Sequence, residues 1–186
     1  MNLILLTGLL VGCFLLLLIE RMGVPTTLEL TFRGDIKRES QWLAQYGQAV
    51  CTAVAGVLIW QFDPAHRKFI LPIFATVATA SVSAFIFKRL FGRMRPKRVN
   101  AGKFMGPSIG HDNSRESFPS SHSACAVALT VSLILLYPDA HMLFWSLALI
   151  TAGLRYVLDA HWPSDVLAGI ALGYVVGFLV MRAFGV

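Results

Sequence analysis

Two histidines and one aspartate have residue types and a spacing that suit nucleophilic and acid–base chemistry. Asp165 follows His161 by four residues, and a carboxylate at that distance can accept the imidazole Nδ1–H, which leaves Nε2 as a nucleophile. A second histidine, His122, ends a Pro-Ser-Ser-His sequence at the start of an apolar run. One histidine could therefore attack phosphorus while the other protonates the departing oxygen, as phosphoryl transfer requires.

Basic and hydroxyl side chains near the same apolar runs could hold a phosphate. Lys88, Arg95 and Arg155 could surround a tetrahedral anion, because guanidinium groups supply paired donors to phosphate oxygens. Ser120 and Ser121 lie where an apolar helix is predicted to begin, so hydroxyls and unpaired backbone N–H groups are available there. The same serines could simply cap the helix, and capping is compatible with phosphate binding.

The residues around these groups favour simpler roles. We expect Arg89, Arg93, Lys97 and Arg98 to extend toward lipid headgroups, as basic residues at the edge of a membrane span commonly do. Asp159 is a possible helical partner for Arg155. Two histidines and an aspartate could also ligate zinc or iron, but the neighbouring cations would repel a divalent ion. We therefore expect no metal site and no cofactor.

The composition indicates an integral membrane protein. The chain has 186 residues, of which 56% are hydrophobic and only 14% are charged, and its mean hydropathy is +0.66. Soluble domains carry about 25% charged residues, so disorder and most soluble enzymes are excluded. At about 20 residues a span, this length allows six spans in one domain.

The apolar runs predict an all-α, polytopic membrane protein with six transmembrane helices in one bundle and a single domain over residues 1–186. The spans are expected at 3–19, 44–62, 69–87, 120–137, 141–158 and 163–181. A short interfacial helix is expected at 35–44. Three glycines at every fourth position of the last span predict close packing against a neighbouring helix; they are Gly169, Gly173 and Gly177.

The predicted topology brings the reactive residues together. Successive spans alternate in direction, so the end of the third, the start of the fourth, the end of the fifth and the start of the sixth share one membrane face. Those four ends carry Lys88, His122, Arg155 and His161, with their neighbours. The sequence therefore predicts an active site at one face of the bundle.

These residues form three short motifs that resemble the signature of the type 2 phosphatidic acid phosphatase superfamily. The motifs are Lys-x6-Arg-Pro (Lys88 to Pro96), Pro-Ser-x-His (Pro119 to His122) and Arg-x5-His-x3-Asp (Arg155, His161 and Asp165). The match covers roughly residues 69–177. The resemblance implies that His161 is the nucleophile that becomes phosphorylated, Asp165 its orienting partner and His122 the general acid. It implies a phosphate cradle that uses no metal, formed by Lys88, Arg95, Ser120, Ser121 and Arg155.

The resemblance further implies a membrane lipid phosphatase, with candidate substrates such as undecaprenyl diphosphate, phosphatidylglycerol phosphate, phosphatidic acid and lipid A phosphates. The chain departs from the common pattern at three positions. Ser121 and Asp159 stand where many members have glycine, and Leu154 stands where many have serine. The expected partners are a lipid phosphate and the bilayer, not nucleic acid. Two alternatives stay open: a phosphotransferase using the same site, and a non-catalytic protein that binds or carries anionic lipids.

Charge and resemblance disagree about orientation. Thirteen of the sixteen Lys and Arg residues fall in loops at the predicted catalytic face and three at the opposite face. The positive-inside tendency would place the catalytic face in the cytoplasm, whereas the resemblance implies an outward site with both termini cytoplasmic. We expect a bacterial inner-membrane protein whose site faces the extracytoplasmic side, where the cations would serve anionic lipid.

Overall fold

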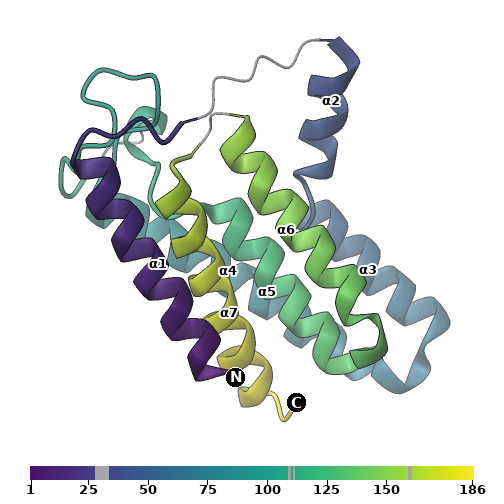
Figure 1. Cartoon of the computed structure of the whole chain (residues 1–186). Coiled ribbons are helices and arrows are strands. Elements are labelled where there is room, and N and C mark those ends of the chain that lie inside the picture. Colours follow the sequence, from purple (N-terminus) through teal and green to yellow (C-terminus); the bar gives the residue numbers. More distant parts are fainter. Residues whose placement is uncertain (28–33, 109, 111, 159–160) are drawn as a thin grey trace.

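The chain folds into a bundle of helices joined by loops (Figure 1). The computed structural model describes residues 1–27, 34–108, 110, 112–158 and 161–186. Its α-helices are α1 (Leu3–Arg21), α2 (Gly34–Leu43), α3 (Ala49–Phe62), α4 (Ile70–Phe91), α5 (Ser121–Leu136), α6 (His141–Val157) and α7 (Pro163–Ala183). Short 3-10 helices precede α4 and α6 and interrupt the α4–α5 loop: η1 (Pro64–Phe69), η3 (Pro138–Ala140) and η2 (Asn113–Arg115).

Six of these helices are apolar, at the six places where the sequence predicts spans. In the described part of the chain, four stretches are long and apolar enough to cross a membrane: Leu3–Arg21, Pro64–Phe91, Pro138–Val157 and Pro163–Ala183. The other two apolar helices, α3 and α5, are shorter, at 14 and 16 residues. The prediction of an all-α membrane fold is therefore confirmed, and four of the six predicted spans are long enough to cross a membrane.

The second apolar helix begins later than predicted because of one glycine. The sequence predicts a span from residue 44, whereas α3 starts at Ala49. Gly47 has a φ of +83°, and a Cβ atom there would lie 2.4 Å from the backbone of Ala126. Only glycine allows both this left-handed conformation and the close approach to α5. The chain therefore turns before α3 instead of continuing as helix.

Helix α5 is the centre of the bundle. Twelve of its sixteen residues are buried, and it contacts α4, α6 and α7. A helix that is apolar on every side is typical of such a central position. Helix α1 is the opposite case, since Cys13 is its only buried residue and α1 contacts α7. The exposed leucines of α1 form a surface suited to lipid.

The predicted close packing of the glycine row is confirmed. A Cβ atom on Gly169 would lie 2.4 Å from the Ser120 carbonyl oxygen, and one on Gly173 would lie 2.2 Å from the Ala124 carbonyl oxygen. Gly177 faces Val131 at 2.7 Å in the same way. The backbones of α5 and α7 therefore touch directly, which holds the starts of the two helices together.

Replacing Gly173 by alanine is expected to destabilise the fold. The added methyl group would meet the backbone of α5, and such overpacking costs about 1–3 kcal/mol. Gly153→Ala on α6 is the matched control, because nothing lies within 4 Å of a Cβ atom there. Thermal unfolding in detergent should give a lower midpoint for Gly173→Ala and an unchanged or higher one for Gly153→Ala. Equal midpoints would contradict the direct backbone contact.

The helix ends that carry the predicted site lie at one end of the bundle, and the two chain termini lie at the other (Figure 1). Helix α4 stops at Gly92, whose φ of +57° and N–H bond to the Lys88 carbonyl close its last turn. Helix α7 starts with Pro163 in its first turn, as predicted. Between α4 and α5 runs a long loop that is pinned by an isolated β-bridge between Arg93 and Phe104.

Candidate active site

The nucleophile predicted from sequence is a buried histidine beside a buried carboxylate. His161 is 1% exposed and Asp165 is 0% exposed, and His161 Nδ1 lies 3.5 Å from Asp165 Oδ2. That distance is longer than an ordinary hydrogen bond, and within the described residues the buried Nδ1 atom has no hydrogen-bond partner. The pair is therefore adjacent but not tightly bonded, as is common before substrate binds.

The electrostatic surroundings keep His161 neutral. Burial, assisted by the positive charges of Lys88 and Arg95, lowers the pKa of His161 to about 4, and the Asp165 carboxylate opposes that change only in part. Neutral imidazole is the nucleophilic form. At neutral pH the ring can therefore attack without first losing a proton.

Asp165 is held by donors from three directions. Its Oδ2 atom accepts the Trp162 backbone N–H at 2.9 Å and the Ser117 hydroxyl. Its Oδ1 atom accepts Arg93 Nη1 at 2.5 Å. The bond from the Trp162 N–H is the capping interaction of this carboxylate at the start of α7. Asp165 thus has a fixed orientation, with Oδ2 on the side of His161.

The predicted cations and the second histidine lie near this pair. Lys88 is buried in the last turn of α4, and the side chain of Arg95 in the following loop donates to the carbonyl oxygens of Asn113 and Glu116 at 2.7 and 3.3 Å. Burial lowers the pKa of Arg95 from its ordinary value. His122 is half-buried in the first turn of α5 and interacts electrostatically with four other site residues: Arg155, His161, Lys88 and Arg95.

Arg155 has a buried donor atom that suits an anion. Its Nε atom is buried and has no hydrogen-bond partner in the described part of the chain. The possible partner Asp159 lies outside the described residues. A buried guanidinium donor without an acceptor is costly in a folded protein, and a phosphate oxygen would satisfy it.

The start of α5 is anchored to the start of α7. Ser120 is the N-cap of α5, as predicted, and its Oγ atom accepts the Ser123 N–H at 3.5 Å and the Ser123 hydroxyl at 3.0 Å. The Ser120 backbone N–H donates to the Asp165 carbonyl oxygen at 2.9 Å. Ser121 is half-buried at the first helical position. The structure therefore brings all three predicted motifs to one end of the bundle.

One prediction for the basic residues was wrong. Arg93 does not extend to headgroups: its side chain is 1% exposed and pairs with Glu20 at 2.7 Å and Asp165 at 2.5 Å. Two buried carboxylates compensate its charge, so it can stay inside. Arg89 is also only partly exposed and lies 3.7 Å from Glu116.

Three residues that support Asp165 or its neighbour Ser164 were not predicted from the sequence to do so. Glu20, Arg93 and Ser117 are buried, and Ser164 is buried beside them. A signal existed for one of them, because Glu20 is a carboxylate directly after an apolar run, where an ionisable side chain needs a partner. Its partner is distant in sequence and could not be read from spacing.

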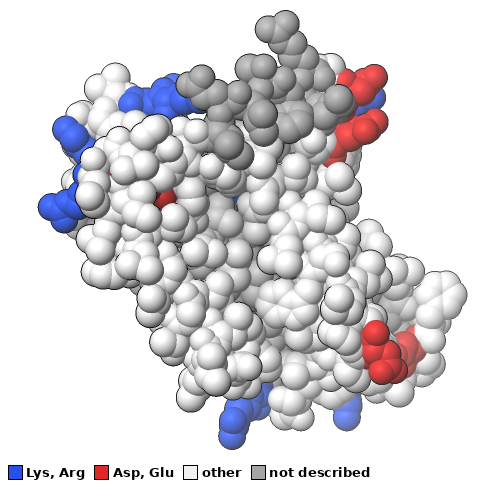
Figure 2. Space-filling model, in the orientation of Figure 1, with Lys and Arg blue, Asp and Glu red and all other residues white. Residues whose placement is uncertain are grey.

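Cationic side chains gather at the end of the bundle that holds the site (Figure 2). Lys97, Arg98 and Lys103 of the α4–α5 loop are exposed there, so the surface around the site is positive. In the residues that the structure describes, no three His, Cys, Asp or Glu side chains are grouped so that they could hold a metal ion. The local charge favours an anionic ligand.

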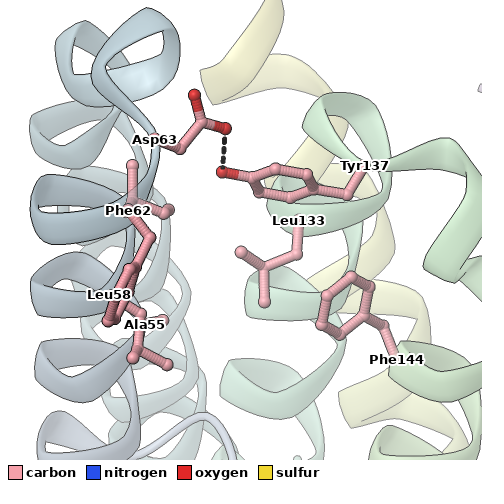
Figure 3. A pocket seen from close by; sticks show the side chains of 8 residues that line it. Ala55, Leu58, Phe62, Asp63, Leu133, Tyr137 and Phe144 are labelled. Carbon is pink, nitrogen blue, oxygen red and sulfur yellow. Dashed lines mark hydrogen bonds between the residues drawn. The ribbon is translucent and has the colours of Figure 1, made fainter.

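A cavity of about 390 Å³ lies at the other end of the bundle. It is lined mainly by apolar side chains of α3, α5 and α6, with Asp63 and Tyr137 at its edge joined by a 2.8 Å hydrogen bond (Figure 3). Asp63 also accepts His66 Nδ1 at 2.6 Å. None of the predicted site residues lines this cavity, so its chemistry is separate from that of His161.

Comparison with known proteins agrees with the motifs. A family model described as the PAP2 superfamily matches residues 69–186. A lipid A 1-phosphatase of Rhizobium johnstonii is 38% identical over 103 residues, 54% of this chain and 42% of that protein. A decaprenylphosphoryl-5-phosphoribose phosphatase of Mycolicibacterium smegmatis is 33% identical over 152 residues, 78% of each chain. The chain thus spans less than half of the Rhizobium lipid A 1-phosphatases it matches.

Solved structures share the fold. The crystal structure of a transmembrane PAP2 type phosphatidylglycerolphosphate phosphatase from Bacillus subtilis superposes with a TM-score of 0.68 at 20% identity, over 96% of this chain and 95% of that one. The structure of Aquifex aeolicus LpxE gives a TM-score of 0.62 at 18% identity, over 81% of this chain and 88% of that one. The apolar helices are those of a multi-pass membrane protein, and the chain belongs to the PAP2 superfamily.

Proposed function

We propose that this protein is a metal-independent lipid phosphatase that works through a phosphohistidine at His161. The observation that carries the proposal is that a buried, neutral imidazole lies at the same end of the bundle as the buried Lys88 and the half-buried Arg95 and Arg155. A nucleophile and fixed positive charges are what a phosphoryl group needs for transfer. The names of the relatives, which are phosphatases of lipid A and of decaprenylphosphoryl-5-phosphoribose, support a lipid substrate.

The reaction would proceed in two steps. In the first, His161 Nε2 attacks phosphorus, the bond from phosphorus to the ester oxygen breaks, and His122 gives its proton to that oxygen. In the second, water attacks the phosphohistidine, the P–N bond breaks, and His122 accepts the proton of the water. Inorganic phosphate leaves and both histidines return to their first state.

The remaining side chains would stabilise the charge of the transferring group. Lys88, Arg95 and Arg155 offer positive charge to the phosphoryl oxygens, and Ser120 and Ser121 lie at the N-terminus of α5, where backbone N–H groups favour an anion. Asp165 would accept a hydrogen bond from the His161 Nδ1–H group as the ring becomes positive. These are the roles that the motif resemblance implies, and the position of the residues at the same end of the bundle as His161 supports them.

Phosphate release from a panel of lipid phosphates tests this proposal. Purified protein in detergent is given phosphatidic acid, phosphatidylglycerol phosphate, undecaprenyl diphosphate or lipid A, each with excess chelator. We expect inorganic phosphate from at least one lipid, undiminished by the chelator. Release that depends on an added divalent cation would overturn the metal-independent reaction, and lipid binding without release from the whole panel would indicate a carrier. A phosphorylated acceptor other than water would identify a phosphotransferase.

We further infer six membrane crossings in a bacterial inner membrane, with the site facing outward. Both termini lie at the end opposite the site (Figure 1), so an outward site places both in the cytoplasm. A reporter enzyme that works only in the periplasm, fused after Val186, is expected to be inactive. The same reporter inserted after Asn100, an exposed position in the α4–α5 loop, is expected to be active. The reverse pattern would place the site in the cytoplasm.

A further inference from the structure

All three nitrogens of the buried Arg93 side chain have partners behind the proposed active site. Its Nε atom donates to the Gly102 carbonyl oxygen at 3.4 Å, Nη1 to Asp165 Oδ1 at 2.5 Å, and Nη2 to Glu20 Oε2 at 2.7 Å. Two aromatic rings flank the guanidinium, with their centroids 5.1 and 5.2 Å from Cζ: those of Phe104 and Trp162. With the Nη1 bond to Ser164 Oγ at 2.6 Å, these contacts use four of the five N–H groups of a side chain that is only 1% exposed.

Glu20 joins the last turn of α1 to the first turn of α7. Its side chain is 2% exposed. Oε2 accepts both Arg93 Nη2 and the Ser164 hydroxyl, the latter at 2.5 Å, and Oε1 accepts the Ser164 backbone N–H at 3.2 Å. Ser164 is the immediate neighbour of Asp165, so Glu20 is linked to the Asp165 carboxylate indirectly, through Arg93 and through Ser164.

Burying the charged cluster of Glu20, Arg93 and Asp165 costs free energy that packing two helices together does not require. Two carboxylates and one guanidinium are taken out of water, and apolar side chains of similar volume commonly stabilise a fold as well or better. What apolar side chains cannot do is bind one particular oxygen of Asp165. Arg93 occupies Oδ1, which leaves Oδ2 on the side of His161.

We propose that Glu20 and Arg93 are positioning residues for the His161–Asp165 pair, and that α1 is thereby part of the reaction machinery. Neither residue faces the phosphate: Glu20 acts through Arg93 and Ser164, and Arg93 acts through Asp165. The family match begins at residue 69, so Glu20 lies outside it. The inference rests on the proposed function, because it concerns the same histidine.

The proposal predicts that removing either charge of the Glu20–Arg93 pair changes the pKa of His161, in opposite directions. Removing the negative charge of Glu20 leaves Arg93 with only one of its two carboxylate partners, Asp165. The net positive charge behind the site rises, which disfavours the imidazolium form and lowers the pKa of His161. Removing the positive charge of Arg93 has the opposite effect. A charge several ångströms away in a buried site changes a pKa by about one unit. Loss of packing alone gives no reason for opposite signs.

Other charged groups that face His161 stay unchanged in these variants. They come from α7, α4, the loop after α4 and α5: Asp165, Lys88, Arg95 and His122. The comparison between variants therefore isolates the contribution of the Glu20–Arg93 pair.

The experiment compares Glu20→Gln, Arg93→Met and Arg93→Lys with wild type and with Glu39→Gln, a matched change of an exposed carboxylate on α2. Two readouts are taken on full-length protein whose thermal unfolding shows that it is folded. The first is kcat and KM on the best lipid of the panel. The second is the titration midpoint of His161, followed by NMR of protein with 13C-labelled histidine, in which one of five signals is assigned by its absence in His161→Asn.

We expect kcat to fall by about 10- to 100-fold in Glu20→Gln with KM changed less than about threefold, because a small misplacement of a reacting group costs about that much. We expect the His161 midpoint to move down in Glu20→Gln, up in Arg93→Met and little in Arg93→Lys or Glu39→Gln. Unchanged midpoints, or shifts of the same sign in the two charge-removing variants, would overturn the proposal. If wild type releases no phosphate from any lipid, the proposed function fails, and the midpoints still decide the positioning role.

Discussion

His161→Asn is expected to lower phosphate release by about 10⁴-fold or more, because it removes the atom that forms the covalent intermediate. Loss of a catalytic nucleophile costs about 10⁶ in kcat in well-studied hydrolases, and the residual rate comes from binding and electrostatic stabilisation. Asparagine keeps much of the volume of the ring and can still donate toward Asp165. The variant should therefore fold, and its thermal midpoint should stay near that of wild type.

The control for this variant is His141→Asn, which makes the same change in an exposed histidine at the start of α6, far along the helix from the site. Both variants are assayed on the same lipid, at the same detergent ratio, with chelator present. Full activity in His141→Asn with none in His161→Asn supports a nucleophilic role. Activity in His161→Asn within tenfold of wild type would exclude His161 as the nucleophile.

His122→Gln is expected to reduce hydrolysis of an alkyl lipid phosphate by about 10²- to 10⁴-fold, the usual contribution of a general acid. An alkoxide is a poor leaving group and needs the proton that His122 supplies. A nitrophenolate leaves without that proton, so the first turnover of an aryl phosphate should be nearly as fast in His122→Gln as in wild type.

The later turnovers add a second check on the role of His122. The same histidine would activate water in the second step, so the variant should release about one equivalent of nitrophenol quickly and then slow down. Stopped-flow absorbance measures both phases. An equal loss on alkyl and aryl substrates in the first turnover would assign His122 to phosphate binding instead of proton transfer.

The grouping of the site residues at one end of the bundle could be predicted, because it depends only on the direction in which each helix runs. Once the apolar runs are placed, alternation alone brings Lys88, His122, Arg155 and His161 to one end, and the structure has them there. The row at Gly169, Gly173 and Gly177 is equally readable, because small residues at every fourth position leave a groove along one face of a helix.

The missed parts depend on contacts between residues far apart in sequence. Spacing gives the depth of Arg93 in the membrane but not its partners, and 73 residues separate it from Glu20. Depth alone predicted a headgroup contact, whereas two buried carboxylates hold the side chain inside. The late start of α3 was also missed because it depends on a contact between distant residues: Gly47 lies against the backbone of Ala126 on α5.

The most direct test of the account is to trap the phosphorylated enzyme. Wild-type protein is mixed briefly with a lipid labelled with ³²P at its terminal phosphate, denatured in alkali and digested, and the labelled peptide is sequenced. The account predicts a label that is stable in alkali, is lost in acid, lies on His161 and is absent from His161→Asn. A label that survives acid, or one on another residue, would contradict the phosphohistidine at His161.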